Sequence, residues 1–165
     1  MSTPNWKGTA EFVGVIAIVG SLIFVGLQIK QEQEIALAEI NLSLLASGIE
    51  LNIAIGENAE VWAIGNAGED LTRAERILYD NLLESMSFSY RTERRQYLQF
   101  DQPRAAKVPI AQFAVFLHRN PGGREAWQLR SDQEAKVWAS LMPGFKSTFR
   151  AAVLADLEKL DKMAK

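Results

Sequence analysis

The run "FVGVIAIVGSLIFVGLQI", residues 12–29, contains eighteen residues without a charged side chain. Thirteen of them are Phe, Val, Ile, Leu or Ala, three are Gly, and the only polar residues are Ser21 and Gln28. A helix rises about 1.5 Å per residue, so the run would span about 27 Å, close to the roughly 30 Å hydrocarbon core of a bilayer. The run therefore predicts a transmembrane helix over residues 12–30.

Two other interpretations of the apolar run are a buried helix and a cleaved export signal. A helix that is apolar on every face needs lipid or a large core around it, and residues 31–165 are too few to enclose it. A signal peptide has a shorter apolar stretch followed closely by small residues. The small residues of Ala36-Leu37-Ala38 are separated from the run by Lys30, Glu32 and Glu34. The membrane interpretation is favoured over both.

The flanks of the run predict contacts with membrane lipid. Trp6, Lys7 and Lys30 lie just outside it, where indole rings and ammonium groups prefer the headgroup layer. Lys7 and the α-amino group slightly outweigh Lys30, which favours a cytoplasmic N-terminus.

Small residues inside the run form one candidate helix interface. Gly14, Ala17 and Ser21 share a helical face, with Gly20 beside them. Small residues let a second membrane helix approach closely, although Gly and Ala are also common in membrane helices generally. The pattern predicts a homo-oligomer or a subunit of a larger membrane complex.

Residues 31–165 predict a helical extramembrane domain, preceded by the span and a short tail, 1–11. Apolar residues keep helical spacing and no segment alternates with period two, so the chain is expected to be all-α. The first helix should continue from the membrane to about Ile55. Capping boxes are predicted at Thr72–Glu75 and Ser131–Glu134. Chain breaks are expected at residues 56–58, 65–68, 101–103, 120–123 and 143–144.

The charge is distributed unevenly along the chain. Residues 31–90 hold eleven acidic side chains against two arginines, and residues 91–165 hold fourteen basic side chains against eight acidic ones. The favoured interpretation is that the two halves face each other and partly cancel; a docking surface is the alternative. The net charge of −2 gives no bias toward nucleic acid.

The densest basic cluster is expected to form surface ion pairs with Glu84, Glu93 or the acidic first helix. The alternative is contact with anionic lipid headgroups or a partner protein. The cluster consists of Arg91, Arg94, Arg95, Arg104 and Lys107.

Residues that carry chemistry are scarce. The chain has no cysteine, and its one histidine, His118, is expected to interact with the carboxyl end of a helix. No spacing typical of a metal site, a nucleophile or a phosphate loop is present. The sequence predicts no catalytic residues, no metal and no cofactor, and hence a protein that is not an enzyme.

Two stretches carry a resemblance to a known family. "EFVGVIAIVGSLIFVGLQIKQ", residues 11–31, and "NPGGREAW", residues 120–127, followed by Pro143 and Phe145, resemble a group of small bacterial inner-membrane proteins of uncharacterised function. The resemblance implies one N-terminal span and a C-terminal helical domain, which in that group is cytoplasmic. This chain has no Lys or Arg between residues 31 and 72, so the side of the domain stays open.

Two classes of function follow. The favoured one is a non-catalytic, single-pass scaffold or accessory subunit of a membrane complex. The alternative is a membrane-tethered helical sensor, a ligand-binding module or a pore-forming module, which requires a cleft with convergent polar groups.

Overall fold

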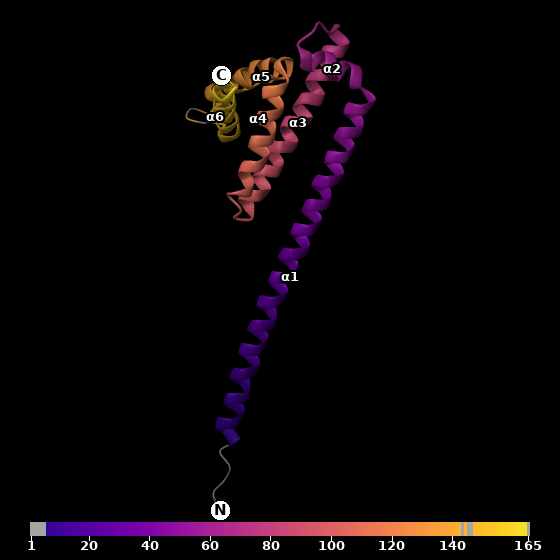
Figure 1. Cartoon of the computed structure of the whole chain (residues 1–165). Helices are drawn as coiled ribbons and strands as arrows, with labels where there is room; N and C mark the ends of the chain where they lie inside the picture. Colours follow the sequence, from indigo (N-terminus) through magenta and orange to yellow (C-terminus); the bar gives the residue numbers. More distant parts are fainter. Residues whose placement is uncertain (1–5, 143, 145–146, 165) are drawn as a thin grey trace, which may run out of the picture. The chain divides into compact units, whose positions relative to one another are not determined.

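The computed structural model describes residues 6–142, 144 and 147–164, with side chains from residue 11 onward. These residues form α-helices and one 3-10 helix, η1, and contain no strand, which confirms the all-α prediction (Figure 1). The side chains of Trp6 and Lys7, and the residues Pro143 and Phe145, lie outside the described part. The elements are α1 (Trp6–Glu57), α2 (Ala59–Ala67), α3 (Arg73–Gln99), η1 (Ala105–Lys107), α4 (Val108–Arg119), α5 (Pro121–Leu141) and α6 (Thr148–Met163).

The chain divides into two compact units, Met1–Leu45 and Ala46–Lys165. The described part of the first unit is the portion of α1 up to Leu45, and the rest of α1 belongs to the second unit. Helix α1 continues past the predicted end near Ile55 by two residues. Asn58 closes it, because its Nδ2 donates to the carbonyl oxygen of Ala54 at 2.8 Å.

The core of the second unit is built from α3, α4, α5 and α6. Phe113 on α4 is fully buried at its centre. Its ring lies 5.5 Å from that of Trp127 in an edge-on arrangement and 5.3 Å from that of Tyr90. Such offset and T-shaped pairs are the favoured geometries of aromatic rings. The buried cluster comprises Tyr79, Leu83, Ile110, Phe113, Ala114, Leu117, Trp127, Phe149, Val153 and Leu157.

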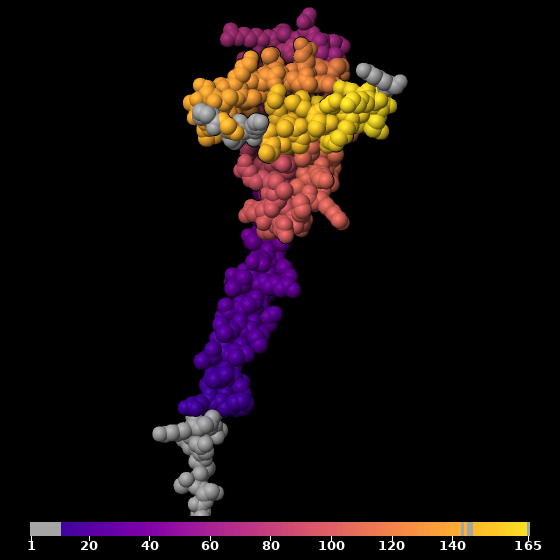
Figure 2. All heavy atoms as spheres, turned by 90° about the vertical axis from the view of Figure 1, so that its left-hand side faces the viewer, coloured from indigo at the N-terminus to yellow at the C-terminus, as the bar shows by residue number. Residues whose placement is uncertain are grey.

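Helices α3 and α4 form an antiparallel pair joined by residues 100–107 (Figure 1). The capping box predicted at the start of α3 is present: Thr72 Oγ accepts from the backbone of Glu75, and the Glu75 carboxylate accepts from the backbone of Thr72. Helix α6 packs against α4, and Figure 2 shows α6 in yellow on the face turned to the viewer.

The break predicted at residues 65–68 is wrong in its first half. Gly65 belongs to α2, which ends only at Ala67, and Gly68 caps it with a φ of 81°. The ring of Tyr79 lies directly against Gly65: a β-carbon there would be 2.3 Å from Tyr79 Cδ2. Gly65 therefore provides space for an aromatic side chain, while Gly68 provides the left-handed turn.

The break predicted at residues 120–123 is confirmed at Asn120, which separates α4 from α5, but it does not extend to the two glycines. Asn120 precedes α5, Pro121 occupies its first turn, and Gly122 and Gly123 are helical. A β-carbon on Gly122 would lie 2.2 Å from the carbonyl oxygen of Gly65. The glycines allow the backbones of α2 and α5 to approach closely, a packing role that local turn propensity does not reveal.

The capping box predicted at Ser131–Glu134 is absent, because α5 runs unbroken from Pro121 to Leu141. Ser131 instead donates to the carbonyl oxygen of Gln128 at 3.1 Å, a bond inside the helix. Downstream of Ser131, the apolar residues Val137, Trp138 and Leu141 are largely exposed. The second half of α5 thus adds little to the core.

Candidate functional site

The apolar run, residues 12–29, lies within α1 and all of its side chains are exposed. Among the described residues, α1 is the one helix long and apolar enough to cross a membrane. Burying such side chains in lipid removes large apolar surfaces from water, which is favourable by a free energy of roughly 25 cal/mol per Å². Without lipid these apolar side chains are exposed to water, which makes residues 12–29 the most unusual feature of the first unit.

The predicted interface residues in the run are equally uncovered. Gly14, Ala17, Gly20 and Ser21 are all exposed. A β-carbon added at Gly14 or Gly20 would meet nothing within 4 Å. The face they form is available to a neighbouring helix.

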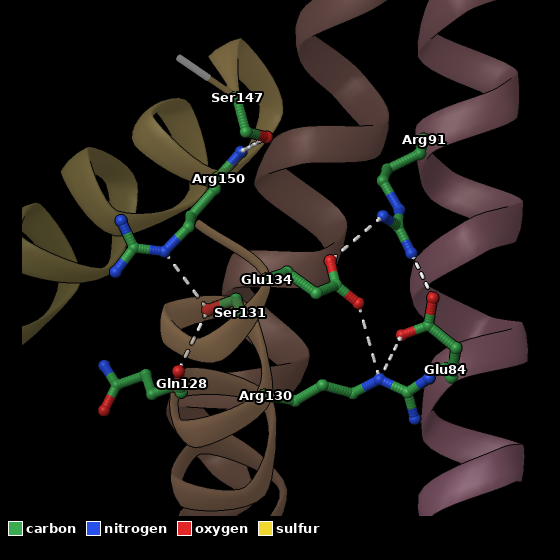
Figure 3. Close-up of polar contacts among 8 residues, drawn as sticks. All are labelled: Glu84, Arg91, Gln128, Arg130, Ser131, Glu134, Ser147 and Arg150. Carbon is green, nitrogen blue, oxygen red and sulfur yellow. Dashed lines mark hydrogen bonds and ion pairs between the residues drawn. The ribbon is translucent and has the colours of Figure 1, made fainter. Parts of the chain in front are cut away.

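In the second unit, a groove of about 1190 Å³ lies between α3 and α5. Two acidic and two basic side chains close a ring across it (Figure 3). Arg91 pairs with Glu84 and lies 3.9 Å from Glu134; Arg130 Nε lies 3.3 Å from Glu84 and 3.5 Å from Glu134. The two positive and two negative charges cancel. The ring joins α3 to α5, and each of its four side chains has a partner of opposite charge.

A second groove of about 680 Å³ borders the first at the beginning of α6. Arg94 donates to Thr148 Oγ1 at 3.1 Å, and Arg150 Nε donates to Ser131 Oγ at 3.2 Å (Figure 3 shows the Arg150 bond). The Ser147 hydroxyl caps α6 by accepting from the backbone of Arg150 at 3.3 Å. These bonds attach the first turn of α6 to α3 and α5.

The predicted basic cluster is brought together in part. Arg91, Arg94 and Arg95 line the second groove, whereas Arg104 and Lys107 lie at η1 and do not. The expected pair between Arg91 and Glu84 is present. The sequence did not indicate the partners on α5, Arg130 and Glu134, although their spacing of four residues is typical of an ion pair on a helix.

The prediction that the acidic half, residues 31–90, pairs with the basic half, residues 91–165, is confirmed for one acidic side chain. Within the described part of the chain, Glu84 is the acidic side chain of residues 31–90 that pairs with the basic half, through Arg91 and Arg130. The remaining ion pairs join residues of the basic half to each other, such as Arg150 with Asp132.

His118 lies in the last turn of α4, as expected, and belongs to a group of three side chains that joins α4, α5 and α6. Its Nδ1 lies 3.1 Å from Asp161 Oδ1 on α6, and Arg124 on α5 binds both oxygens of the same carboxylate at 2.9 and 2.8 Å. The hydrogen bonds from Arg124, supported by His118, lower the pKa of Asp161 from 3.8 to about 2. No sequence pattern indicated this group, because His118, Arg124 and Asp161 lie in three separate helices.

Two buried polar side chains of the second unit, Tyr79 on α3 and Asn66 on α2, satisfy each other. Burial raises the pKa of Tyr79 to about 12, and its hydroxyl donates to Asn66 Oδ1 at 2.9 Å. Throughout the described residues no group of three His, Asp or Glu side chains could hold a metal ion. The bond between Tyr79 and Asn66 holds α2 to α3.

Comparison of the chain with protein-family models, with curated proteins and with solved structures found no significant match.

Proposed function

We propose that this protein is a non-catalytic, single-pass membrane protein of the bacterial inner membrane, in which α1 is the anchor and the helical domain is a scaffold for other proteins. The apolar run carries the proposal: eighteen uncharged residues in one helix, all exposed to solvent in the chain alone. Lipid is the environment in which such a surface is stable. The resemblance of residues 11–31 to small inner-membrane proteins supports the same location.

The scaffold role rests on the paired charges of the domain. The carboxylates that line the groove between α3 and α5 include Glu84 and Glu134, and both bind arginines of the same groove. A catalytic site keeps titratable groups whose pKa values are shifted and which face a cleft. Asp161, whose pKa is shifted, instead joins α4, α5 and α6, so its charge serves the fold.

Extraction of bacterial membranes with alkaline carbonate tests the anchor. The full chain should stay in the membrane pellet. The variant Val19→Arg/Ile23→Arg should move to the soluble fraction, since each arginine near the centre of a span costs about 2.5 to 3.5 kcal/mol.

The control variant is Ser43→Arg/Ser47→Arg, which places the same two arginines on α1 outside the run. It should stay in the pellet. Release of the unaltered chain by carbonate would exclude a membrane anchor. Protease digestion of intact spheroplasts then assigns the side of the domain: cleavage from outside places it beyond the cytoplasm.

A further inference from the structure

An exposed aliphatic stripe continues along α1 beyond the apolar run. Ile35, Leu42 and Leu45 are 52%, 66% and 61% exposed, and exposed Ala38 lies between them. The spacings of three, four and three residues are those of the a and d positions of a coiled coil. This part of the helix lies outside the predicted span, so lipid does not account for the stripe.

The same heptad register continues backward through the apolar run. Counting in alternating steps of four and three from Ile35 reaches the face predicted from small residues. Ser21 and Gln28, the two polar residues of the run, both fall on it. On a straight helix a heptad stripe drifts by about 20° per repeat, so these residues stay within one broad face of α1. The complete set is Gly14, Ala17, Ser21, Phe24, Gln28, Gln31, Ile35, Ala38, Leu42 and Leu45.

We infer that this face, here called the α1 seam, binds the α1 seam of a second copy of the same chain as a parallel coiled coil that begins in the membrane. The inference rests on the proposed membrane anchor and adds the partner and its orientation. Anchoring by the same segment places two copies parallel and at equal depth. Each seam residue then meets its own counterpart.

The polar residues of the seam favour a second copy over an unrelated helix. A glutamine or serine in a membrane helix is stabilised by a hydrogen-bond partner at the same depth, and an identical helix supplies one at every such level. Gln28 can bond to Gln28 of the second copy, and Ser21 to its own counterpart. Polar residues at a positions also fix the register between two helices.

The flanks of the seam oppose association weakly. Glu34 and Glu39 occupy the g and e positions on either side of Ile35, and in a parallel pair Glu34 of one copy faces Glu39 of the other. Like charges at this distance in water repel slightly and are screened by salt. Association through the seam should therefore be strengthened by salt.

Cysteine cross-linking in native membranes tests the inference, and the chain has no cysteine that would interfere. Ala38→Cys and Leu42→Cys lie on the seam. Their controls are Ala36→Cys and Ser43→Cys, which are exposed like the seam residues and lie about 160° from Ala38 and about 100° from Leu42 around the helix. Each single-cysteine full-length variant is oxidised in carbonate-washed membranes, and the disulfide-linked dimer is followed over time.

The seam variants should form dimers at least tenfold faster than their controls. Equal rates, faster dimerisation of a control, or no dimer from either seam variant would overturn the inference. Carbonate washing separates this result from the proposed anchor. Protein that stays in the pellet without dimerising contradicts the seam alone, whereas protein released by carbonate contradicts the anchor.

Discussion

Gly65 and Gly122 show how a single missing side chain decides the packing of the domain. The carbonyl oxygen of Gly65 occupies the space that a β-carbon on Gly122 would need. Because the obstacle is backbone, no change of rotamer can relieve it. A substitution at Gly122 must move α2 and α5 apart.

Gly122→Ala is expected to destabilise the domain by about 1 to 3 kcal/mol, the usual cost of overfilling a packed interior. Urea unfolding of the full chain in mild detergent, followed by tryptophan fluorescence, measures it. Gly48→Ala is the matched control, since a β-carbon there meets nothing within 4 Å. That control should be neutral or stabilise the helix by up to about 1 kcal/mol. Equal effects of the two substitutions would contradict the close approach of α2 and α5.

Asp161 makes the stability of the domain depend on pH in the acid range. Its pKa is about 2 in the folded chain, below the ordinary 3.8, because Arg124 and His118 stabilise the carboxylate. A lowered folded-state pKa contributes stability above pH 4 that is lost as the pH falls toward 2. Asp161→Asn should therefore lower the melting temperature at pH 7 and have little effect near pH 2. Thermal unfolding followed by circular dichroism at both pH values measures the difference; a constant difference would contradict this role.

At the scale of elements, the charged ring between α3 and α5 should behave as coupled ion pairs. A double-mutant cycle with Glu84→Gln and Arg91→Gln should give a coupling free energy of about 0.5 to 1 kcal/mol, in the upper range for partly exposed pairs. The side chains are 26% and 31% exposed, so added salt should reduce the coupling. The pair of Lys162 with Glu158 on α6, exposed on both sides, should couple less. A coupling of zero for Glu84 and Arg91 would show that the ring does not join the two helices.

The flanking charges of the α1 seam give a second prediction at this scale. Glu34→Lys replaces repulsion across the proposed pair by attraction to Glu39 of the other copy. It should speed dimerisation of the Ala38→Cys variant at low salt, and high salt should remove most of the gain. Glu50→Lys, further along α1, is the control and should leave the rate unchanged. A slower rate with Glu34→Lys would argue against a parallel pairing.

Helices were predictable where local chemistry decides them. The Thr72 capping box, the helical spacing along α3 and the apolar run of α1 each act within a few residues. The errors occurred where tertiary contacts override local propensity. Gly122 and Gly123 are typical of a turn but allow close contact between α5 and α2. Ser131 is typical of a helix N-cap but lies inside α5. The group of His118, Arg124 and Asp161 was not predictable, because no local pattern links three helices.

At the scale of the whole molecule, the buried cluster lies entirely in residues 79–157, within the unit Ala46–Lys165. A fragment of residues 46–165 should therefore fold without the apolar run. It should unfold in one cooperative transition, with a free energy of roughly 5 to 15 kcal/mol as for ordinary domains. Circular dichroism and tryptophan fluorescence should give coincident curves. Absence of a cooperative transition would mean that residues 1–45 are required for folding.

The close approach of Gly65 and Gly122 also limits which substitutions this sequence can accept during evolution. Most packing faults are repaired by a second substitution in the facing side chain, but here the facing atom is a carbonyl oxygen, which every amino acid carries. No exchange at position 65 could compensate for a change at position 122. Homologous sequences that keep this fold should therefore differ at the positions next to 122 but retain Gly122.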